Sequence, residues 1–227
     1  MPQRYRKPST FLDYMCEYLS RQKNYLFAKS VCRAKNSISK IEGLAEQAPC
    51  MSKAPLDRAD LLLEIGIPGF PPHNNISNKA YAFSDALFDK PEDDRGSMRG
   101  SVRHVLWQAE ITGRYGKDAA MQIGNCHERQ KPFYPNEKLY ASFDDADRAV
   151  DQLNNEIGRR LGNRFRNLST KELALEIMNA GLAEGFYRVK KRDDGYFDVV
   201  KEPMSKDEYE RAYQQLLRLN DNGKIKE

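Results

Sequence analysis

The sequence has few cysteines, and their spacing excludes two kinds of stabilised fold. Four cysteines are scattered along 227 residues, and no two form a Cys-x-x-Cys pair: Cys16, Cys32, Cys50 and Cys126. Disulfide-rich domains and zinc knuckles carry cysteines in close, regular pairs. We therefore expect reduced thiols, with neither a disulfide framework nor a zinc knuckle.

Long hydrophobic runs are also missing. A helix that crosses a bilayer needs about 20 largely apolar residues, and no segment approaches that length. The first 24 residues carry basic side chains but lack the apolar core and small-residue cleavage site of a Sec signal peptide. We expect a protein without a transmembrane segment, made in the cytoplasm without a Sec signal.

The excess of positive charge is confined to the start of the chain. The whole sequence carries a net charge of +4, whereas residues 1–40 hold nine basic and two acidic side chains, a local charge of +7 that leaves −3 for the rest. Such a segment fits a solvated helix face, an anionic membrane, an acidic partner or a nucleic acid. The rest of the chain, residues 41–227, is not basic, and this argues against nucleic acid as the main partner.

The apolar pattern predicts a mainly α fold. With 40% hydrophobic residues the chain is too apolar to be disordered, and its length suits one large domain with extensions. Apolar residues at helical spacing, together with capping residues, predict helices over 10–35 (one or two), 101–115, 117–128, 142–161, 169–181 and 205–219. Residues 186–201 predict a β-hairpin that turns at Asp194-Gly195.

These elements suggest three parts. Residues 1–50 form a basic helical segment and linker, residues 57–185 form a helical domain that carries the motifs, and residues 186–227 form a β-hairpin and a helix that pack on it. The expected fold is therefore mainly α, a helical domain with one small C-terminal β-hairpin.

The segment after Arg103 places polar groups on an apolar helix face. His104, Trp107 and Gln108 stand at i, i+3 and i+4, so they share one side of the predicted helix. Trp107 is the only tryptophan of the chain and should face inward. His104 is then either a core histidine satisfied by a neighbour, or a general base or ligand.

His127 ends the apolar face of the following helix. Its neighbour Glu128 is not part of a zinc-protease HExxH motif, because no second histidine follows at that spacing. His127 and Glu128 therefore form only a weak signal by themselves.

The helix over 142–161 carries a second polar face beside its core stripe. Asp151, Asn154, Asn155 and Gly158 gather there. A glycine inside a helix costs about 1 kcal/mol relative to alanine, so Gly158 suggests the close approach of a ligand or of another backbone. The alternative is an ordinary solvated face.

Packing of the three helices would bring several of these side chains into one pocket. We expect His104, His127, Glu128, Asp151 and Asn155 to converge there. Imidazoles and carboxylates so placed either bind a divalent metal or run metal-free acid/base chemistry. The carboxamides would hold the substrate or steer the ligands.

The motif order in this region resembles a known bacterial domain. The order is Arg-His-x-x-Trp, then His-Glu, then Asp-x-x-Asn-Asn-x-x-Gly-Arg, within about residues 95–162. The domain it resembles occurs alone and at the C-terminal ends of large secreted toxin-like proteins, and its activity is unassigned. The resemblance implies one functional cluster: His104, Trp107, His127, Glu128, Asp151, Asn154, Asn155 and Gly158.

The resemblance also bears on Cys126. Members of that family commonly carry a small residue, often alanine, at this position. A thiol nucleophile with His104 or His127 as its base is chemically feasible, but a structural cysteine fits the family pattern better.

From the motifs and the resemblance we expect a secreted antibacterial or host-directed effector, a hydrolase of a cell-envelope component, either peptidoglycan or phospholipid. We then expect export to the target cell by a machine such as type VI secretion. A cognate immunity protein or a delivery chaperone would be its partner. His104, His127, Glu128 and Asp151 would act as catalytic or ligand groups; the substrate-binding residues would be Trp107, Gln108, Asn154, Asn155 and Gly158. The basic N-terminal segment would serve delivery, partner docking or anchoring on anionic lipid.

Two other classes of function fit the same pattern. A non-enzymatic binding or interaction module would use the polar cluster as a structural hydrogen-bond network. A nucleic-acid-directed toxin would use the basic N-terminal segment to bind its target.

Overall fold

The computed structural model describes residues 64–66, 74–89, 94–127 and 139–226. The chain divides into two compact units, Met1–Leu62 and Leu63–Glu227, and every described residue belongs to the second. The helices and linker predicted within residues 1–56 therefore lie outside the described residues.

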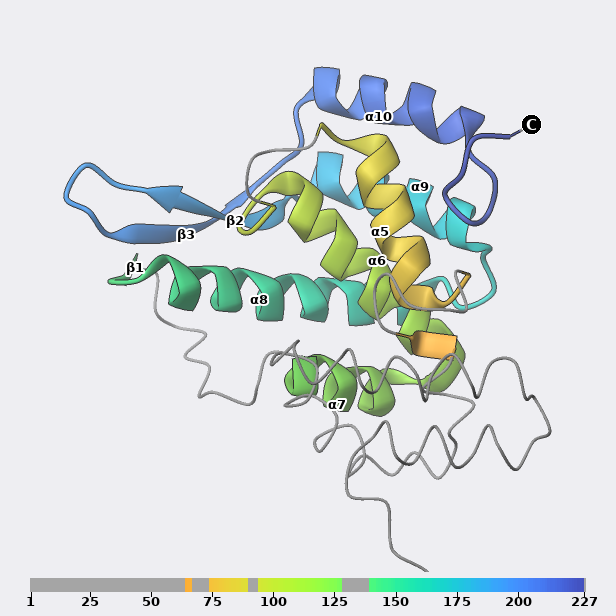
Figure 1. Cartoon of the computed structure of the whole chain (residues 1–227), viewed down its shortest axis with the longest axis horizontal. Helices are drawn as coiled ribbons and strands as arrows, with labels where there is room; N and C mark the ends of the chain where they lie inside the picture. Colours follow the sequence, from red (N-terminus) through yellow and green to blue (C-terminus); the bar gives the residue numbers. More distant parts are fainter. Residues whose placement is uncertain (1–63, 67–73, 90–93, 128–138, 227) are drawn as a thin grey trace, which may run out of the picture. The chain divides into compact units, whose positions relative to one another are not determined.

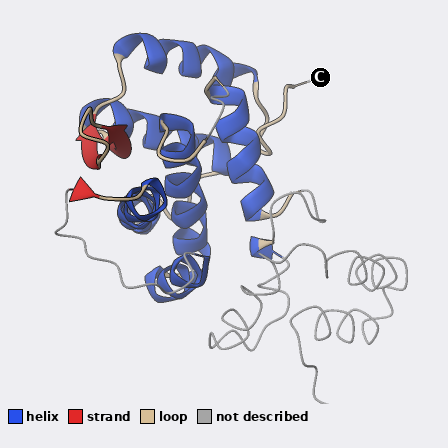
Figure 2. Cartoon of the chain, turned by 60° about the vertical axis from the view of Figure 1, so that its left-hand side comes forward, coloured by secondary structure: helices blue, strands red, loops and turns tan. Residues whose placement is uncertain are grey.

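The second unit is mainly α, as predicted. Its described residues form six helices and three short strands (Figures 1 and 2). The helices are α5 (Ile76–Leu87), α6 (Met98–Tyr115), α7 (Lys117–His127), α8 (Phe143–Arg164), α9 (Thr170–Ala183) and α10 (Lys206–Arg218). The strands are β1 (Leu139–Tyr140), β2 (Phe186–Lys191) and β3 (Phe197–Glu202). None of the described helices is long and apolar enough to cross a membrane.

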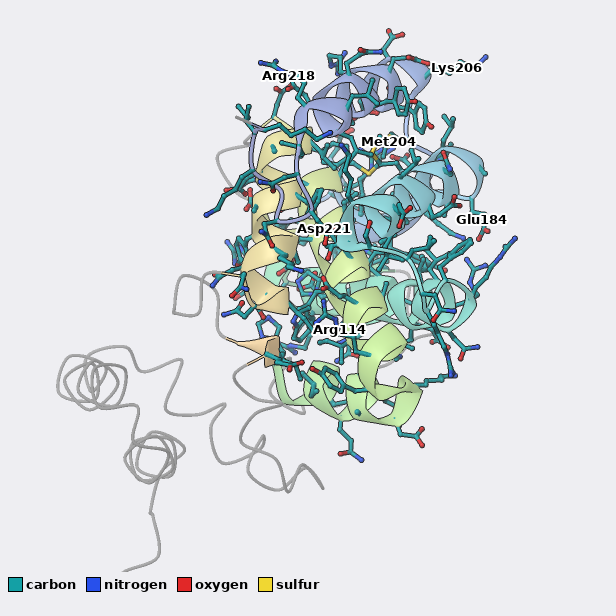
Figure 3. All side chains as sticks on the ribbon, turned by 90° about the vertical axis from the view of Figure 1, so that its right-hand side faces the viewer. Arg114, Glu184, Met204, Lys206, Arg218 and Asp221 are labelled. Atoms are coloured by element: carbon teal, nitrogen blue, oxygen red, sulfur yellow. The ribbon has the colours of Figure 1, made fainter. Side chains whose placement is uncertain are left out.

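Helix α6 is the centre of the fold. It packs against α5, α7, α8 and α9, while α10 covers α5 and α9 (Figure 1). Apolar side chains with little or no exposure fill the space between these helices, among them Phe83, Val105, Leu106, Ile177 and Leu216. Met204, labelled in Figure 3, belongs to the same core between α9 and α10. Helix α6 thereby fixes the relative positions of the elements that carry the motifs.

Helices α6 and α8 approach unusually closely. A Cβ built on Gly158 would lie 2.8 Å from Gln108 Cβ and would also meet the carbonyl oxygen of Val105. A Cβ on Gly162 would lie 2.8 Å from the Cα of Ala109 and would also meet the Ala109 carbonyl oxygen. Glycines four residues apart lie on one face of a helix, so α8 presents a smooth face to the α6 backbone. The close approach predicted at Gly158 is therefore that of another helix.

The sheet contains the predicted hairpin and one further strand. Strands β2 and β3 form the expected antiparallel hairpin, but β1 adds a third strand in the order β1-β3-β2, with Leu139 opposite Asp198 and Tyr140 opposite Phe197. Two residues are too few to show an alternating pattern in the sequence. The pairing of β1 is therefore decided by its tertiary contact with β3.

Local signals set most helix ends close to where they were expected. Ser142 caps α8, and capping boxes form at Ser169–Glu172 before α9 and at Ser205–Glu208 before α10. Gly116, at φ 89°, separates α6 from α7. Such caps depend on residues three positions apart, which explains why the sequence predicts them.

The prediction omitted α5. Asn75 caps it, and Ile76, Ala80, Phe83 and Leu87 form a buried stripe at helical spacing. The apolar stripe is short and follows a proline-rich segment, so the sequence signal is weaker there.

Candidate functional site

Six of the nine residues predicted for the site meet where α6, α7 and α8 pack together. We call them the His104 cluster: His104, Trp107 and Gln108 of α6, His127 of α7, and Asp151 and Asn155 of α8. The i, i+3, i+4 spacing on α6 and the i, i+4 spacing on α8 turn these side chains toward one another.

His104 lies at the centre of the cluster, with only 4% of its surface exposed. Its Nδ1 is 3.2 Å from Asn155 Oδ1, and its Nε2 is 3.4 Å from Asp151 Oδ1. A carboxamide oxygen can only accept a hydrogen bond, so Nδ1–H is the donor. In the neutral ring, Nε2 therefore keeps its lone pair and faces the carboxyl group.

Burial shapes the protonation of this pair. It lowers the pKa of His104 from 6.5 to about 3, helped by the nearby charge of Arg103 and opposed by the hydrogen bond to Asn155. Burial raises the pKa of Asp151 from 3.8 to about 7, against the effect of Arg103. Both shifts disfavour the charged form in a low-dielectric interior. Just below neutral pH the pair therefore holds one proton, on Asp151 and directed at His104.

Aromatic rings connect the buried imidazole with the surface. The ring of His127 lies 5.8 Å from that of His104 and 5.2 Å from that of Trp107, between centroids. His104 and Trp107 meet edge to face at 6.3 Å. Since Trp107 is half-buried and His127 is exposed, the cluster extends from the interior to the protein surface.

Asn154 and Gly158 stand apart from the cluster. Asn154 accepts a hydrogen bond from the backbone N–H of Tyr187 at 3.0 Å and donates to the carbonyl oxygen of Tyr187 at 2.9 Å. Its carboxamide thus makes the two backbone hydrogen bonds with β2 that a neighbouring strand would otherwise make. Gly158 packs on the α6 backbone. The contacts described for these two residues are thus with β2 and α6, and their expected contact with a substrate stays a prediction.

Two further positions that the sequence singled out, Cys126 and Glu128, have side chains that the structure does not describe. Glu128 is outside the described residues, and nothing is described of the Cys126 side chain. Within the described part of the chain, no group of three or more His, Cys, Asp or Glu side chains is placed to hold a metal ion. The expectations of a Glu128 role and of a divalent metal therefore stay predictions.

Three residues near the cluster were not assigned a role from sequence. Arg103 is part of the Arg-His-x-x-Trp motif, and its charge acts on both His104 and Asp151. Arg159 donates to Gln108 Oε1 at 3.1 Å. Gly124 of α7 lies beside the Gln108 and Asn155 carboxamides. Arg159 ends the Asp-x-x-Asn-Asn-x-x-Gly-Arg motif and follows Asn155 by four residues, so both the motif and helical spacing could have indicated it.

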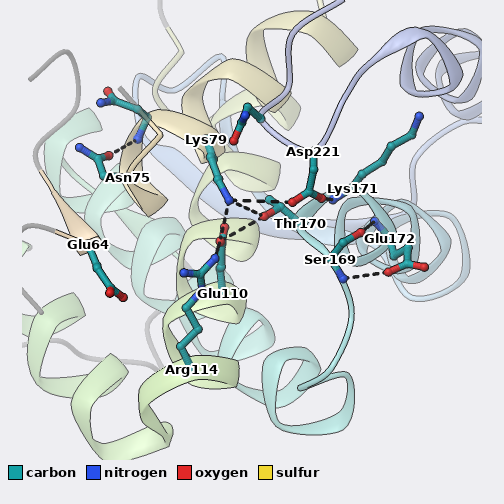
Figure 4. Close-up of polar contacts among 12 residues, drawn as sticks. Glu64, Asn75, Lys79, Glu110, Arg114, Ser169, Thr170, Lys171, Glu172 and Asp221 are labelled. Atoms are coloured by element: carbon teal, nitrogen blue, oxygen red, sulfur yellow. Dashed lines mark hydrogen bonds and ion pairs between the residues drawn. The ribbon is translucent and has the colours of Figure 1, made fainter. Parts of the chain in front are cut away.

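A second buried polar cluster lies on another part of α6. In this Glu110 cluster, Glu110 Oε1 accepts from Arg114 at 2.6 Å and Thr170 at 3.1 Å, and lies 3.6 Å from Lys79 Nζ (Figure 4). Lys79 also donates to Thr170 at 3.2 Å and lies 4.0 Å from Asp221. The cluster thus joins α5, α6, α9 and the C-terminal turn.

A groove of about 970 Å³ lies between the end of α5, the start of α6, the hairpin and α10. Two of the arginines that line it are paired with carboxylates: Arg99 with Asp94 at 2.5 Å, and Arg188 with Glu202 at 2.6 Å. Because these charges compensate one another, the His104 cluster is the stronger candidate for chemistry.

Comparison with known proteins identifies a family but no annotated relative. No curated protein and no solved structure matches the chain. A family described as a domain of unknown function, DUF6973, matches residues 69–185. That range contains α5 to α9 and the whole His104 cluster, and it covers just over half of the chain. The chain therefore belongs to the DUF6973 family.

Proposed function

We propose that this protein is an effector hydrolase that acts on a cell-envelope component, with His104 and Asp151 as its acid/base pair. The observation that carries the proposal is the 3.4 Å contact between His104 Nε2 and Asp151 Oδ1 inside a buried cluster. A pair of titratable groups whose pKa values are both displaced by burial is typical of catalytic sites.

The pair suits the movement of a proton at neutral pH. Asn155 holds Nδ1–H of His104, so Nε2 faces Asp151 and the two groups share one proton. When Asp151 is ionised, the pair takes a proton from an attacking water; it then returns that proton to the leaving group. Positioned acid/base groups of this kind contribute roughly 10²- to 10⁴-fold to a rate.

The surroundings suit a substrate that approaches from the surface. Trp107 and His127 form an aromatic wall between His104 and solvent. The toxin-like setting comes from the motif order, which resembles a domain found at the ends of large secreted proteins. On this proposal, peptidoglycan or phospholipid is the target, a machine such as type VI secretion exports the protein, and an immunity protein or chaperone is its partner.

Growth of bacteria that express the protein tests the proposal. We expect wild type to inhibit growth when directed to the periplasm, and Asp151→Asn and His104→Gln to abolish inhibition while the purified variants stay folded by circular dichroism. Glu156→Gln is the matched control, because it replaces an exposed carboxylate of α8 with its amide. Equal growth of wild type and variants in both cytoplasm and periplasm would refute the toxin proposal.

A second candidate is a non-enzymatic interaction module. It is favoured by the 4% exposure of His104 and by partners at both of its ring nitrogens, as in a structural network. In that case His104→Gln should lower the thermal stability markedly, because it leaves buried polar groups unpaired. A folded, stable but inactive His104→Gln variant distinguishes the hydrolase from this module.

A further inference from the structure

We propose that Asp94 and Tyr81 are positioning residues that hold the guanidinium group of Arg103 in place. Arg103 directly precedes His104 on α6, so the held charge lies at the edge of the His104 cluster. The proposal rests on the proposed function, because it concerns the acid/base pair of that site and adds two residues that act on the pair through Arg103.

Asp94 binds two arginines of α6. Its Oδ2 accepts a hydrogen bond from Arg103 at 3.2 Å, and its Oδ1 accepts one from Arg99 at 2.5 Å. The side chain of Arg99 is 4% exposed and also contacts Asp85. Since Arg99 and Arg103 are four residues apart, their guanidinium groups lie on one side of the helix. The Asp94 carboxylate joins them.

The backbone of Asp94 is anchored to the first turn of α6. Its carbonyl oxygen accepts from Ser97 Oγ at 2.6 Å and from the Ser97 N–H at 3.2 Å. A Cβ built on Gly100 would overlap the same oxygen, so a glycine is needed for this close approach. Because the backbone is fixed, the carboxylate reaches Arg103 from one defined point.

Tyr81 of α5 provides a second contact for Arg103. The guanidinium carbon lies 4.7 Å from the centroid of the Tyr81 ring, within the range of a cation–π interaction. The Arg103 side chain is 16% exposed. A free arginine side chain has large rotamer entropy, so an ion pair and a ring contact together restrict where its charge can lie.

The charge of Arg103 acts on both members of the acid/base pair. Burial is the larger cause of each displaced pKa, and Arg103 lowers both the pKa of Asp151 and that of His104. The neighbouring helices also bring His127 of α7 and, one turn before Asp151 on α8, Asp147. Movement of Arg103 away from the pair would therefore make Asp151 hold its proton more strongly.

The sign of the effect separates positioning from a direct effect of Asp94. The Asp94 carboxylate is negative, so its loss alone would lower the pKa of Asp151. If Asp94 acts by holding Arg103, its loss releases the guanidinium group and raises that pKa.

Two variants test the proposal without altering the acid/base pair. Asp94→Ala removes the carboxylate and keeps the anchored backbone. Tyr81→Leu removes the ring at a position that is 36% exposed, so the fold does not depend on it. Asp85→Ala is the matched control, because it removes the other carboxylate on Arg99 and leaves the contacts of Arg103 in place.

The pKa of Asp151 is read from the carbon-13 NMR shift of its side-chain carboxyl group during a pH titration of the full chain. We expect Asp94→Ala and Tyr81→Leu to raise it above about 7, in the direction of Arg103→Gln and not beyond it. Asp85→Ala should leave it unchanged. In the Arg103→Gln background, Asp94→Ala should raise it no further, because effects that act through one residue are not additive.

The growth assay of wild type separates this inference from the proposed function. If wild type inhibits growth and neither variant raises the pKa of Asp151, the positioning roles are overturned and the hydrolase proposal stands. A lowered pKa in Asp94→Ala would also overturn them, and if that variant does not fold, Tyr81→Leu decides alone. A raised pKa in both variants, without growth inhibition by wild type, would support the positioning of Arg103 and overturn the toxin proposal.

Discussion

The carboxyl groups of Glu110, with 5% of the side chain exposed, and Asp151, with 16% exposed, have contrasting surroundings. Burial raises the pKa of each, but Lys79, Arg114 and then Thr170 oppose the shift at Glu110. Glu110 Oε1 has Arg114 at 2.6 Å and Lys79 at 3.6 Å. The corresponding neighbour of Asp151 is a neutral imidazole at 3.4 Å.

The difference shows how one fold uses buried charge in two ways. A carboxylate that contacts two cations and a hydroxyl ties elements together, and the two cations favour its ionised form. A carboxyl group beside a neutral imidazole, with its pKa raised to about 7, can both take up and release a proton near neutral pH. The Glu110 cluster is therefore structural, and the His104 cluster is the one suited to chemistry.

The largest difference should appear in stability. Glu110→Gln removes the carboxylate that Arg114 and Lys79 share, and loss of one partner from a buried ion pair costs roughly 3 kcal/mol or more. Asp151→Asn leaves no unpaired charge and should cost about 1 kcal/mol or less. Urea unfolding of both variants at pH 7 measures the two free energies, and equal losses would contradict the comparison.

A smaller effect concerns the pH dependence of stability. Between pH 3.8 and 6.5 the unfolded chain carries one proton on the His104–Asp151 pair, on the imidazole, and the folded chain also carries one, on the carboxyl. Unfolding then changes no proton count, so the wild-type pair adds no slope in this window.

Single substitutions should expose two opposite slopes. In Asp151→Asn, His104 takes a proton only in the unfolded chain from pH 6.5 down to about 3, so stability falls as pH falls. In His104→Gln, Asp151 keeps its proton only in the folded chain from pH 3.8 to about 7, so stability falls as pH rises. Urea titrations across this range provide the measurement, and slopes of the same sign would refute the shared-proton description.

The smallest expected effect is on the pH profile of activity. Arg103 lowers the pKa of Asp151, so Arg103→Gln should move the inflection of kcat/KM to a pH above about 7. Arg114→Gln removes a cation from the Glu110 cluster and should leave that inflection in place. An inflection that responds to Arg114 and not to Arg103 would reverse the roles assigned to the two clusters.

The neighbouring residues Asn154 and Asn155 show which features of the site the sequence predicts and which it does not. Helical spacing put both on one polar face of α8, yet Asn154 bonds to the backbone of β2 and Asn155 to His104. Successive residues on a helix point about 100° apart, so which neighbour each one meets depends on the elements packed on either side. Position along the helix was predictable, and the partner was not.

The sequence by itself determined the helices from α6 to α10, their caps and the hairpin, because these depend on residues a few positions apart. It also indicated His104, Trp107 and Asp151 as members of one cluster. Only the tertiary structure decided that Gly158 serves helix packing, that β1 completes the sheet, and that one buried carboxyl is neutralised by cations while the other faces an imidazole. Burial and charge compensation arise between distant segments, and for that reason they set the chemistry of the site only once α6, α7 and α8 have packed.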